Sequence, residues 1–229
     1  MWKDSHGRTA RKLRVSVTDR CNLRCTYCMP AEPRWLPREN ILSYEELARI
    51  VRVATASGVD SVRLTGGEPL LRRDLPKFVS MLRAVPDLRD LAMTTNGIFL
   101  EKNAQALLDA GLDRLTVSLD SLDPERYARL ARRTGFEETL RGMDAAEAAG
   151  FGPLKVNVVV MRGINDDEIA RLADWGRRKG RIMRFIEFMP LEGDRIWSRN
   201  RLVPAEEIVE CIGARFPLIA RPTEERSTA

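Results

Sequence analysis

The chain has 229 residues, and its 38 Lys and Arg side chains against 33 Asp and Glu give a formal net charge of +5. With 44% apolar and 31% charged residues, the composition is that of a globular protein and excludes a disordered acidic chain. One domain of this length can bury a large core, although two small domains would also fit it. The charge is too modest and too evenly spread to predict a nucleic-acid surface.

Neither a membrane span nor a signal peptide is predicted. No apolar run approaches the ~18 residues that cross a bilayer, and residues 1–12 lack the apolar stretch of a signal peptide. We therefore expect a cytoplasmic protein without membrane contact.

Strand-like and helix-like segments alternate along the chain. The strand-like segments are Lys12–Thr18, Ser61–Thr65, Asp90–Thr95, Arg114–Leu119, Leu154–Val160 and Ile182–Phe188. The first helix is predicted to begin after Ser43, with Glu46 completing a capping box, and others begin at Asp123 and at Asn165. Glycines that can adopt the left-handed conformation follow four helical segments: Gly58, Gly111, Gly150 and Gly180. Six such units predict one α/β domain, residues 1–229, with parallel strands.

The predicted strands have one apolar and one polar face. In the first strand Leu13 and Val15 alternate with Arg14 and Ser16, and later strands alternate in the same way. A closed eight-stranded barrel has a lumen packed mainly with branched apolar side chains. A polar inner face and six units instead predict an open, partial (β/α)6 barrel of the TIM type, with helices outside. In the last strand Arg184 and Met189 have opposite parity, so a bulge or an early strand end must separate them.

Three of the four cysteines lie on one loop after the first strand. Cys21, Cys25 and Cys28 form C-x-x-x-C-x-x-C, which can ligate three irons of an iron–sulfur cube and leave the fourth iron open. A structural zinc site is one alternative, but it needs four N or S ligands. His6, the single histidine, and Cys211, at the helical spacing of a core position, are poor candidates for the fourth. Surface thiols without a ligand are a third interpretation.

Cations gather on the polar face of the predicted sheet. They are Arg14, Arg63 and Lys155, with Arg184 as a further candidate, and they outnumber Asp120. Guanidinium groups suit phosphate oxygens, so this face predicts a polyphosphate ligand. The alternative is that the cations pair with carboxylates such as Glu68, Asp120 or Glu187, because buried charges are usually paired.

The Cys loop, together with Gly66-Gly67-Glu68-Pro69 after the second strand, resembles the radical S-adenosylmethionine (SAM) superfamily. The resemblance implies one [4Fe-4S] cluster on Cys21, Cys25 and Cys28, whose open iron chelates SAM. It further implies a reductant protein and a 5′-deoxyadenosyl radical formed by reductive cleavage of the sulfonium.

Within that superfamily the chain is similar to the GTP 3′,8-cyclase family of molybdenum cofactor biosynthesis. The similarity runs from Arg14 to Met189 through Thr-Asp-Arg-Cys-Asn, Thr-Gly-Gly-Glu-Pro-Leu, Thr-Thr-Asn-Gly, Ser-Leu-Asp and Phe-Met-Pro. It implies a lyase that converts GTP to (8S)-3′,8-cyclo-7,8-dihydroguanosine 5′-triphosphate. Carried over position by position, SAM would be bound by Tyr27, Gly67, Ser118 and Met189, and GTP by Arg14, Arg63, Thr94 and Lys155.

That family also has a C-terminal segment with a second cysteine triad and a glycine-rich tail. The present sequence has only Cys211 after the first triad. We therefore expect one cluster and poor GTP turnover. Two further interpretations stay open: a SAM- and nucleotide-binding protein without catalysis, and a radical SAM enzyme acting on another anionic substrate.

Overall fold

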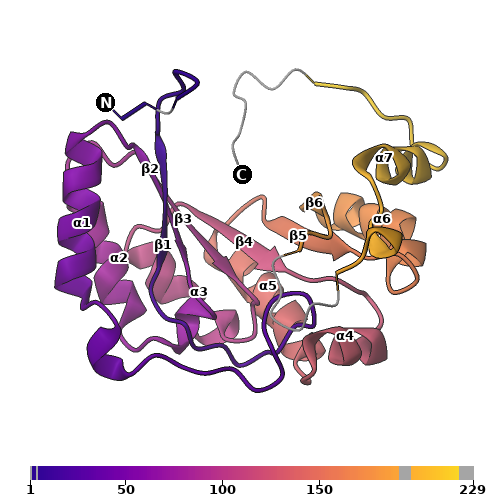
Figure 1. Ribbon diagram of the computed structural model, residues 1–229, viewed down its shortest axis with the longest axis horizontal. Coiled ribbons are helices and arrows are strands. Elements are labelled where there is room, and N and C mark those ends of the chain that lie inside the picture. Colours follow the sequence, from indigo (N-terminus) through magenta and orange to yellow (C-terminus); the bar gives the residue numbers. More distant parts are fainter. Residues whose placement is uncertain (1, 4, 191–196, 222–229) are drawn as a thin grey trace.

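The computed structural model describes residues 2–3, 5–190 and 197–221. Six parallel strands form one sheet in chain order: β1 (Lys12–Ser16), β2 (Ser61–Thr65), β3 (Asp90–Thr95), β4 (Arg114–Ser118), β5 (Lys155–Val160) and β6 (Ile182–Glu187). Within these residues β1 and β6 lie at the two edges and do not pair with each other, so the sheet is open (Figure 1). The predicted open partial barrel is confirmed. The single-domain prediction extends over residues 1, 4, 191–196 and 222–229, which lie outside the described residues.

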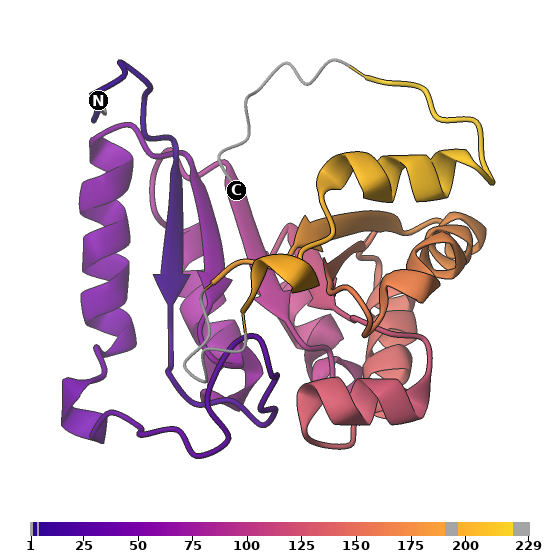
Figure 2. The same ribbon diagram turned by 45° about the vertical axis from the view of Figure 1, so that its right-hand side comes forward.

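Helices cover the outer face of this sheet (Figure 2). They are α1 (Tyr44–Ala56), α2 (Leu75–Arg83), α3 (Leu100–Asp109), α4 (Pro124–Ala131), α5 (Phe136–Ala149), α6 (Ile169–Lys179) and α7 (Ala205–Gly213). The strand side chains that alternate with the polar ones point toward the helices. Val62, Leu64, Leu91, Val117 and Val156 are all 0% exposed. Burial of this apolar face drives the sheet and helices together.

Most predicted helix ends are confirmed. The Ser43 side chain accepts a hydrogen bond from the Glu46 backbone amide, and the Glu46 carboxylate accepts one from the Ser43 amide, at 3.2 and 2.7 Å. The Asp123 carboxylate accepts from the Arg126 amide at 2.7 Å and begins α4. The four glycines that were predicted to end helices all have positive φ: Gly58, Gly111, Gly150 and Gly180.

The predicted helix start at Asn165 is confirmed in position, but the Asn165 side chain forms no cap. A 3-10 turn (Asp166–Glu168) follows Asn165, α6 begins only at Ile169, and the Asn165 side chain does not cap either of them. Its amide instead donates to the backbone oxygens of Asp120 and Val159, at 2.8 and 2.9 Å. Asn165 is 1% exposed, so its polar groups are used to join β4 to β5 rather than to begin a helix.

Two helices, rather than one, connect β4 to β5. Helix α4 ends at Arg132, which has a left-handed φ of 52°, and Gly135 with φ 140° precedes α5. An added Cβ on Gly135 would lie 2.5 Å from the Ile98 Cδ1 atom, so this turn is packed against the segment that follows β3. The break places the C-terminus of α4 beside the Cys loop.

Strand β6 ends at Glu187, and Met189 therefore lies beyond it. Of the two predicted ways to separate Arg184 from Met189, a bulge or an early end of the strand, the early end is confirmed. Residues 197–213 lie against this end of the sheet: the Trp197 indole donates to the Phe188 oxygen at 3.0 Å, and Met161 forms an isolated bridge with Leu202. No helix in the described ranges has both the length and the apolar character that a bilayer crossing requires.

Candidate functional site

The Cys loop is held against the fold by its backbone. The Arg24 amide donates to the Ala131 oxygen at 2.8 Å, and the Thr26 amide donates to the Leu130 oxygen at 2.9 Å. Both acceptors are carbonyls of the last turn of α4, which have no partner within their own helix. On the other side, the Asn96 side-chain amide donates to the Asn22 oxygen at 2.8 Å. The loop is thus fixed to the ends of two elements distant in sequence.

The double glycine packs directly on the residues that lead into this loop. The Gly67 amide donates to the Thr18 oxygen at 2.6 Å, and the Glu68 amide donates to the Arg20 oxygen at 2.8 Å. A Cβ on Gly67 would lie 2.2 Å from the Arg20 oxygen, and one on Gly66 would lie 2.5 Å from the Thr18 oxygen. Glycine is required at both positions because two backbones approach here without room for a side chain.

Glu68 joins the ends of β2 and β3 from inside. Its carboxylate is 1% exposed and accepts hydrogen bonds from the Thr95 hydroxyl at 2.7 Å and the Asn96 amide at 2.8 Å. Burial raises the pKa of Glu68, and these donors, with the Leu70 amide, act in the opposite direction. Its role in the structure is to fix the two loops that carry Gly67 and Asn96.

The residues predicted to bind SAM lie around the C-terminal ends of the strands. Tyr27 is half-buried, and its hydroxyl donates to the Asp120 carboxylate at 2.6 Å. Ser118 is the last residue of β4 and half-buried, and Gly67 lies beyond β2. Met189 is 49% exposed, two residues past β6. The structure places the four at one end of the barrel, and their assigned roles stay predictions.

Burial shifts the pKa values of two side chains at this end of the barrel, Asp120 and Tyr27. Burial raises the pKa of Asp120 to about 6, and the Tyr27 hydroxyl and the Val159 amide oppose the shift by bonding the carboxylate. Burial also raises the pKa of Tyr27, and the charge of Asp120 adds to that effect. The phenol is therefore the donor of this pair, and Asp120 the acceptor.

The residues predicted to bind GTP lie on the inner face of the sheet. Arg14 and Arg63 are paired in register between β1 and β2, and Lys155 is paired with Thr116 between β4 and β5. The Arg63 guanidinium donates to the hydroxyls of Thr94 and Thr116, at 3.2 and 3.1 Å. The inner face thus brings all four residues, Arg14, Arg63, Thr94 and Lys155, onto one surface, as their parity predicts, while their binding roles stay predictions.

Repulsion between these cations is visible in their pKa values. Burial lowers the pKa of Arg63, and the charges of Arg114, Arg184 and Arg14 lower it further. The pKa of Lys155 is lowered by burial and by Arg114, Arg184 and Arg63. The charge of Asp90 opposes these shifts but does not reverse them, so the face keeps an excess of positive charge that favours the binding of an anion.

The carboxylates proposed as alternative partners are engaged elsewhere. Glu68 and Asp120 accept the bonds described above, and the Glu187 carboxylate accepts from the Ala205 amide at 2.7 Å. In the described part of the chain none of the three forms an ion pair with the inner cations Arg14, Arg63, Lys155 and Arg184. The pairing alternative is therefore wrong for these three carboxylates.

An ion pair that was not predicted from the sequence lies on the same face. Asp90 accepts hydrogen bonds from the Arg114 guanidinium at 2.7 Å and from the Ser61 hydroxyl at 2.6 Å. Asp90 has the parity of Thr94 on β3, and Arg114 has the parity of Thr116 on β4. Asp90 and Arg114 are the first residues of β3 and β4, and the same alternation of polar and apolar residues predicts that they face the inner side.

The three thiols of the Cys loop form an open donor set. Cys21 and Cys25 are half-buried and Cys28 is exposed. Burial raises the pKa of all three, so a bound metal must displace their protons. Among the described residues, no three His, Cys, Asp or Glu side chains are grouped so that they could hold a metal ion. Cys21 and Cys28 each act on the pKa of Cys25 by their charge, so the three thiols face one region, and the ligation of three different irons stays a prediction. Cys211 lies on α7 and packs against the core, as predicted.

Comparison with known proteins shows the family of the chain. Residues 15–176 match the Radical SAM superfamily. The chain is 49% identical over 226 residues to the GTP 3′,8-cyclase of Acidothermus cellulolyticus, which covers 96% of this chain and 62% of that protein. It is 46% identical over 228 residues to the GTP 3′,8-cyclase of Streptomyces coelicolor, covering 99% of this chain and 67% of that one. The chain thus spans about two thirds of the length of these curated relatives.

Solved structures show the same fold at lower sequence identity. Streptococcus suis SuiB bound to S-adenosylmethionine aligns with a TM-score of 0.62 and 21% identity, over 77% of this chain and 38% of that one. This likeness supports the partial barrel observed here, in which the distinctive loops follow the strand ends.

Proposed function

Because this chain belongs to the radical SAM superfamily, and within it to the family of the GTP 3′,8-cyclases, we propose that it carries the radical-generating site of such a cyclase. Cys21, Cys25 and Cys28 would hold one [4Fe-4S] cluster. The substrate would be GTP, and an electron-donor protein would reduce the cluster. Such a cluster, when bound and reduced, would supply the electron for reductive cleavage of SAM and so the 5′-deoxyadenosyl radical with which the cyclisation of GTP begins.

The residues of this chain would bind and orient the two small molecules. Tyr27, Gly67, Ser118 and Met189 surround the end of the barrel where the Cys loop lies and would hold SAM. Arg14, Arg63, Thr94 and Lys155 lie farther down the inner face and would hold GTP. The cations would pair with the triphosphate, which leaves the nucleoside to extend toward the Cys loop.

The observation that carries this proposal is the cationic inner face beneath the Cys loop. Arg63 is fixed by two hydroxyls, from Thr94 and Thr116, rather than by a carboxylate. Asp90, which is bonded to Arg114, offsets only part of the positive charge around Arg63, and burial strengthens the attraction of the remaining charge for phosphate. Such a face favours a polyphosphate substrate over a neutral one.

The test uses protein whose cluster has been reconstituted without oxygen. Labelled SAM and a chemical reductant are added with and without GTP, and 5′-deoxyadenosine is measured. We expect its formation to rise with GTP and to be abolished in Cys25→Ala. Cys211→Ala is the matched control and should keep the activity of the unchanged protein.

Each outcome separates the interpretations. SAM cleavage that GTP does not change would contradict the GTP assignment and favour a radical enzyme with another anionic substrate. No SAM cleavage, with GTP still bound, would favour a nucleotide-binding protein without catalysis. Iron below one per chain together with stoichiometric zinc would contradict the radical SAM assignment of the site.

A further inference from the structure

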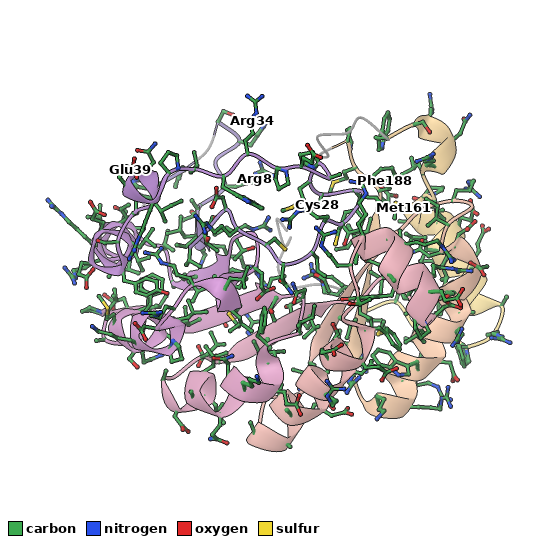
Figure 3. The ribbon with its side chains drawn as sticks, turned by 90° about the horizontal axis from the view of Figure 1, so that it is seen from below. Arg8, Cys28, Arg34, Glu39, Met161 and Phe188 are labelled. Atoms are coloured by element: carbon green, nitrogen blue, oxygen red, sulfur yellow. The ribbon has the colours of Figure 1, made fainter. Side chains whose placement is uncertain are left out.

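The Tyr27 hydroxyl is directed by two side chains, the Asp120 carboxylate at 2.6 Å and the Cys25 thiol, and the bond to the buried Asp120 carboxylate is the charge-assisted one. Its half-buried ring packs against a small apolar cluster, formed by Leu130, Met161 and Phe188, that is separate from the main core. Met161 and Phe188 lie near each other in the view from below (Figure 3). Apolar contacts are not directional and do not by themselves fix the rotation of the ring. The hydrogen bond from the Tyr27 hydroxyl to Asp120, 2.6 Å long, does fix it.

Asp120 is itself rigidly placed. One oxygen of its carboxylate accepts from Tyr27, and the other accepts from the Val159 amide at 2.8 Å. Its backbone oxygen accepts from the Asn165 amide at 2.8 Å, and the Asn165 side-chain oxygen accepts from the Met161 amide at 2.8 Å. Asp120 is only 8% exposed, and Asn165 is 1% exposed. The carboxylate therefore cannot turn away from Tyr27 without breaking bonds between the ends of β4 and β5.

Burial of this carboxylate is costly. A carboxylate can accept about four hydrogen bonds, and among residues 2–3, 5–190 and 197–221 two donors reach the one on Asp120. An apolar residue could fill the same volume without the loss of hydration. What the carboxylate adds is a charge-assisted, oriented bond to one phenol.

We propose that Asp120 is a positioning residue for Tyr27. It fixes the angle of the ring and, through it, the segment between Cys25 and Cys28. This inference rests on the proposed function, in which Tyr27 forms one wall of the SAM site. In this role Asp120 acts through its bond to Tyr27.

The test is a double-mutant cycle of Tyr27→Phe, Asp120→Ala and the double variant. In reconstituted, reduced protein, SAM affinity is measured from the change that SAM causes in the electron paramagnetic resonance spectrum. Each single change should weaken SAM binding by about tenfold, which is the range of one hydrogen bond to a charged group. The double variant should bind SAM more tightly than the product of the two single effects predicts, because both changes break the bond between Tyr27 and Asp120. Full overlap is not expected, since Asp120→Ala also removes the bond from the Val159 amide and Tyr27→Phe the contact with Cys25.

A second measurement uses the metal-free protein and does not depend on SAM. Hydrogen–deuterium exchange of the amides of residues 24–28 should be faster by a similar factor in both single variants. Tyr44→Phe on α1 is the matched control: it removes a tyrosine hydroxyl that donates to the Arg73 backbone oxygen at 2.9 Å. It should leave both SAM affinity and exchange at residues 24–28 unchanged.

The outcomes are distinguishable from a failure of the proposed function. If the two single changes weaken SAM binding additively, or if exchange at residues 24–28 is unchanged in Asp120→Ala, the positioning role is wrong. If SAM does not alter the spectrum of the unchanged protein, the proposed function fails, and the exchange measurement still decides the positioning role.

Discussion

Replacing Gly67 by alanine tests whether the double glycine is set by contact between two backbones. The added Cβ would lie 2.2 Å from the Arg20 oxygen and 2.5 Å from the Asp19 oxygen. Ordinary contacts of this kind are above 3.4 Å, so the loop must move by about 1 Å. Overpacking costs about 1–3 kcal/mol, and the bonds from Gly67 and Glu68 to the Cys loop, at about 1 kcal/mol each, would be strained as well. We expect a loss of about 3 kcal/mol.

The assay is thermal unfolding of the metal-free protein, followed by iron analysis after reconstitution. For a chain of this size, about 3 kcal/mol corresponds to a fall of about 6–12 °C in the unfolding temperature. The control is Gly213→Ala on α7, where the added Cβ would meet only the Leu218 side chain at 3.8 Å. That change should leave the unfolding temperature the same or slightly higher. Equal unfolding temperatures and equal iron contents in the two variants would refute the reasoning.

Three further predictions follow from individual contacts. Arg63→Ala should weaken GTP binding to the metal-free protein by at least about tenfold in calorimetry. Arg63→Lys should keep only part of the affinity of the unchanged protein, because lysine lacks the planar guanidinium group. Equal affinity in all three proteins would contradict this prediction. Burial raises the pKa of Asp120 to about 6 from its ordinary 3.8, so the folded protein binds this proton more tightly than the unfolded chain does. The resulting stabilisation is complete below about pH 4 and is lost as the pH rises through about 6. Relative to Asp120→Asn, the free energy of unfolding should therefore fall by up to about 3 kcal/mol between about pH 4 and pH 7, and a constant difference in urea unfolding would contradict it. Ser43→Ala should cost about 1 kcal/mol in the same assay by removing the cap of α1, and a change near zero would show that the cap contributes nothing.

The sheet and its two faces could be predicted because they depend on local pattern. Alternation of apolar and polar residues fixes which side chains share a face, so the sequence alone predicts that Arg14, Arg63 and Lys155 lie on one surface. Ser43 and the helix-ending glycines carry their signal within a few residues. The early end of β6 was one of two outcomes that parity allowed.

Contacts between distant loops could not be predicted in the same way. Tyr27 and Asp120 are 93 residues apart, and nothing near either residue indicates their bond. Asn165 has the residue type of a helix cap, and only the fold shows that its amide is used between β4 and β5. Likewise, the sequence shows two glycines after β2 but not the backbone of Arg20 that lies against them. These contacts arise from tertiary packing, which overrides local propensity.

The most direct test of the account is the iron and sulfide content of three proteins reconstituted without oxygen. The unchanged chain and Cys211→Ala should each hold about four irons and four sulfides, and the variant with Cys21, Cys25 and Cys28 all changed to alanine should hold none. Iron that remains in the triple variant, or that is lost from Cys211→Ala, would contradict the claim that these three residues carry the cluster.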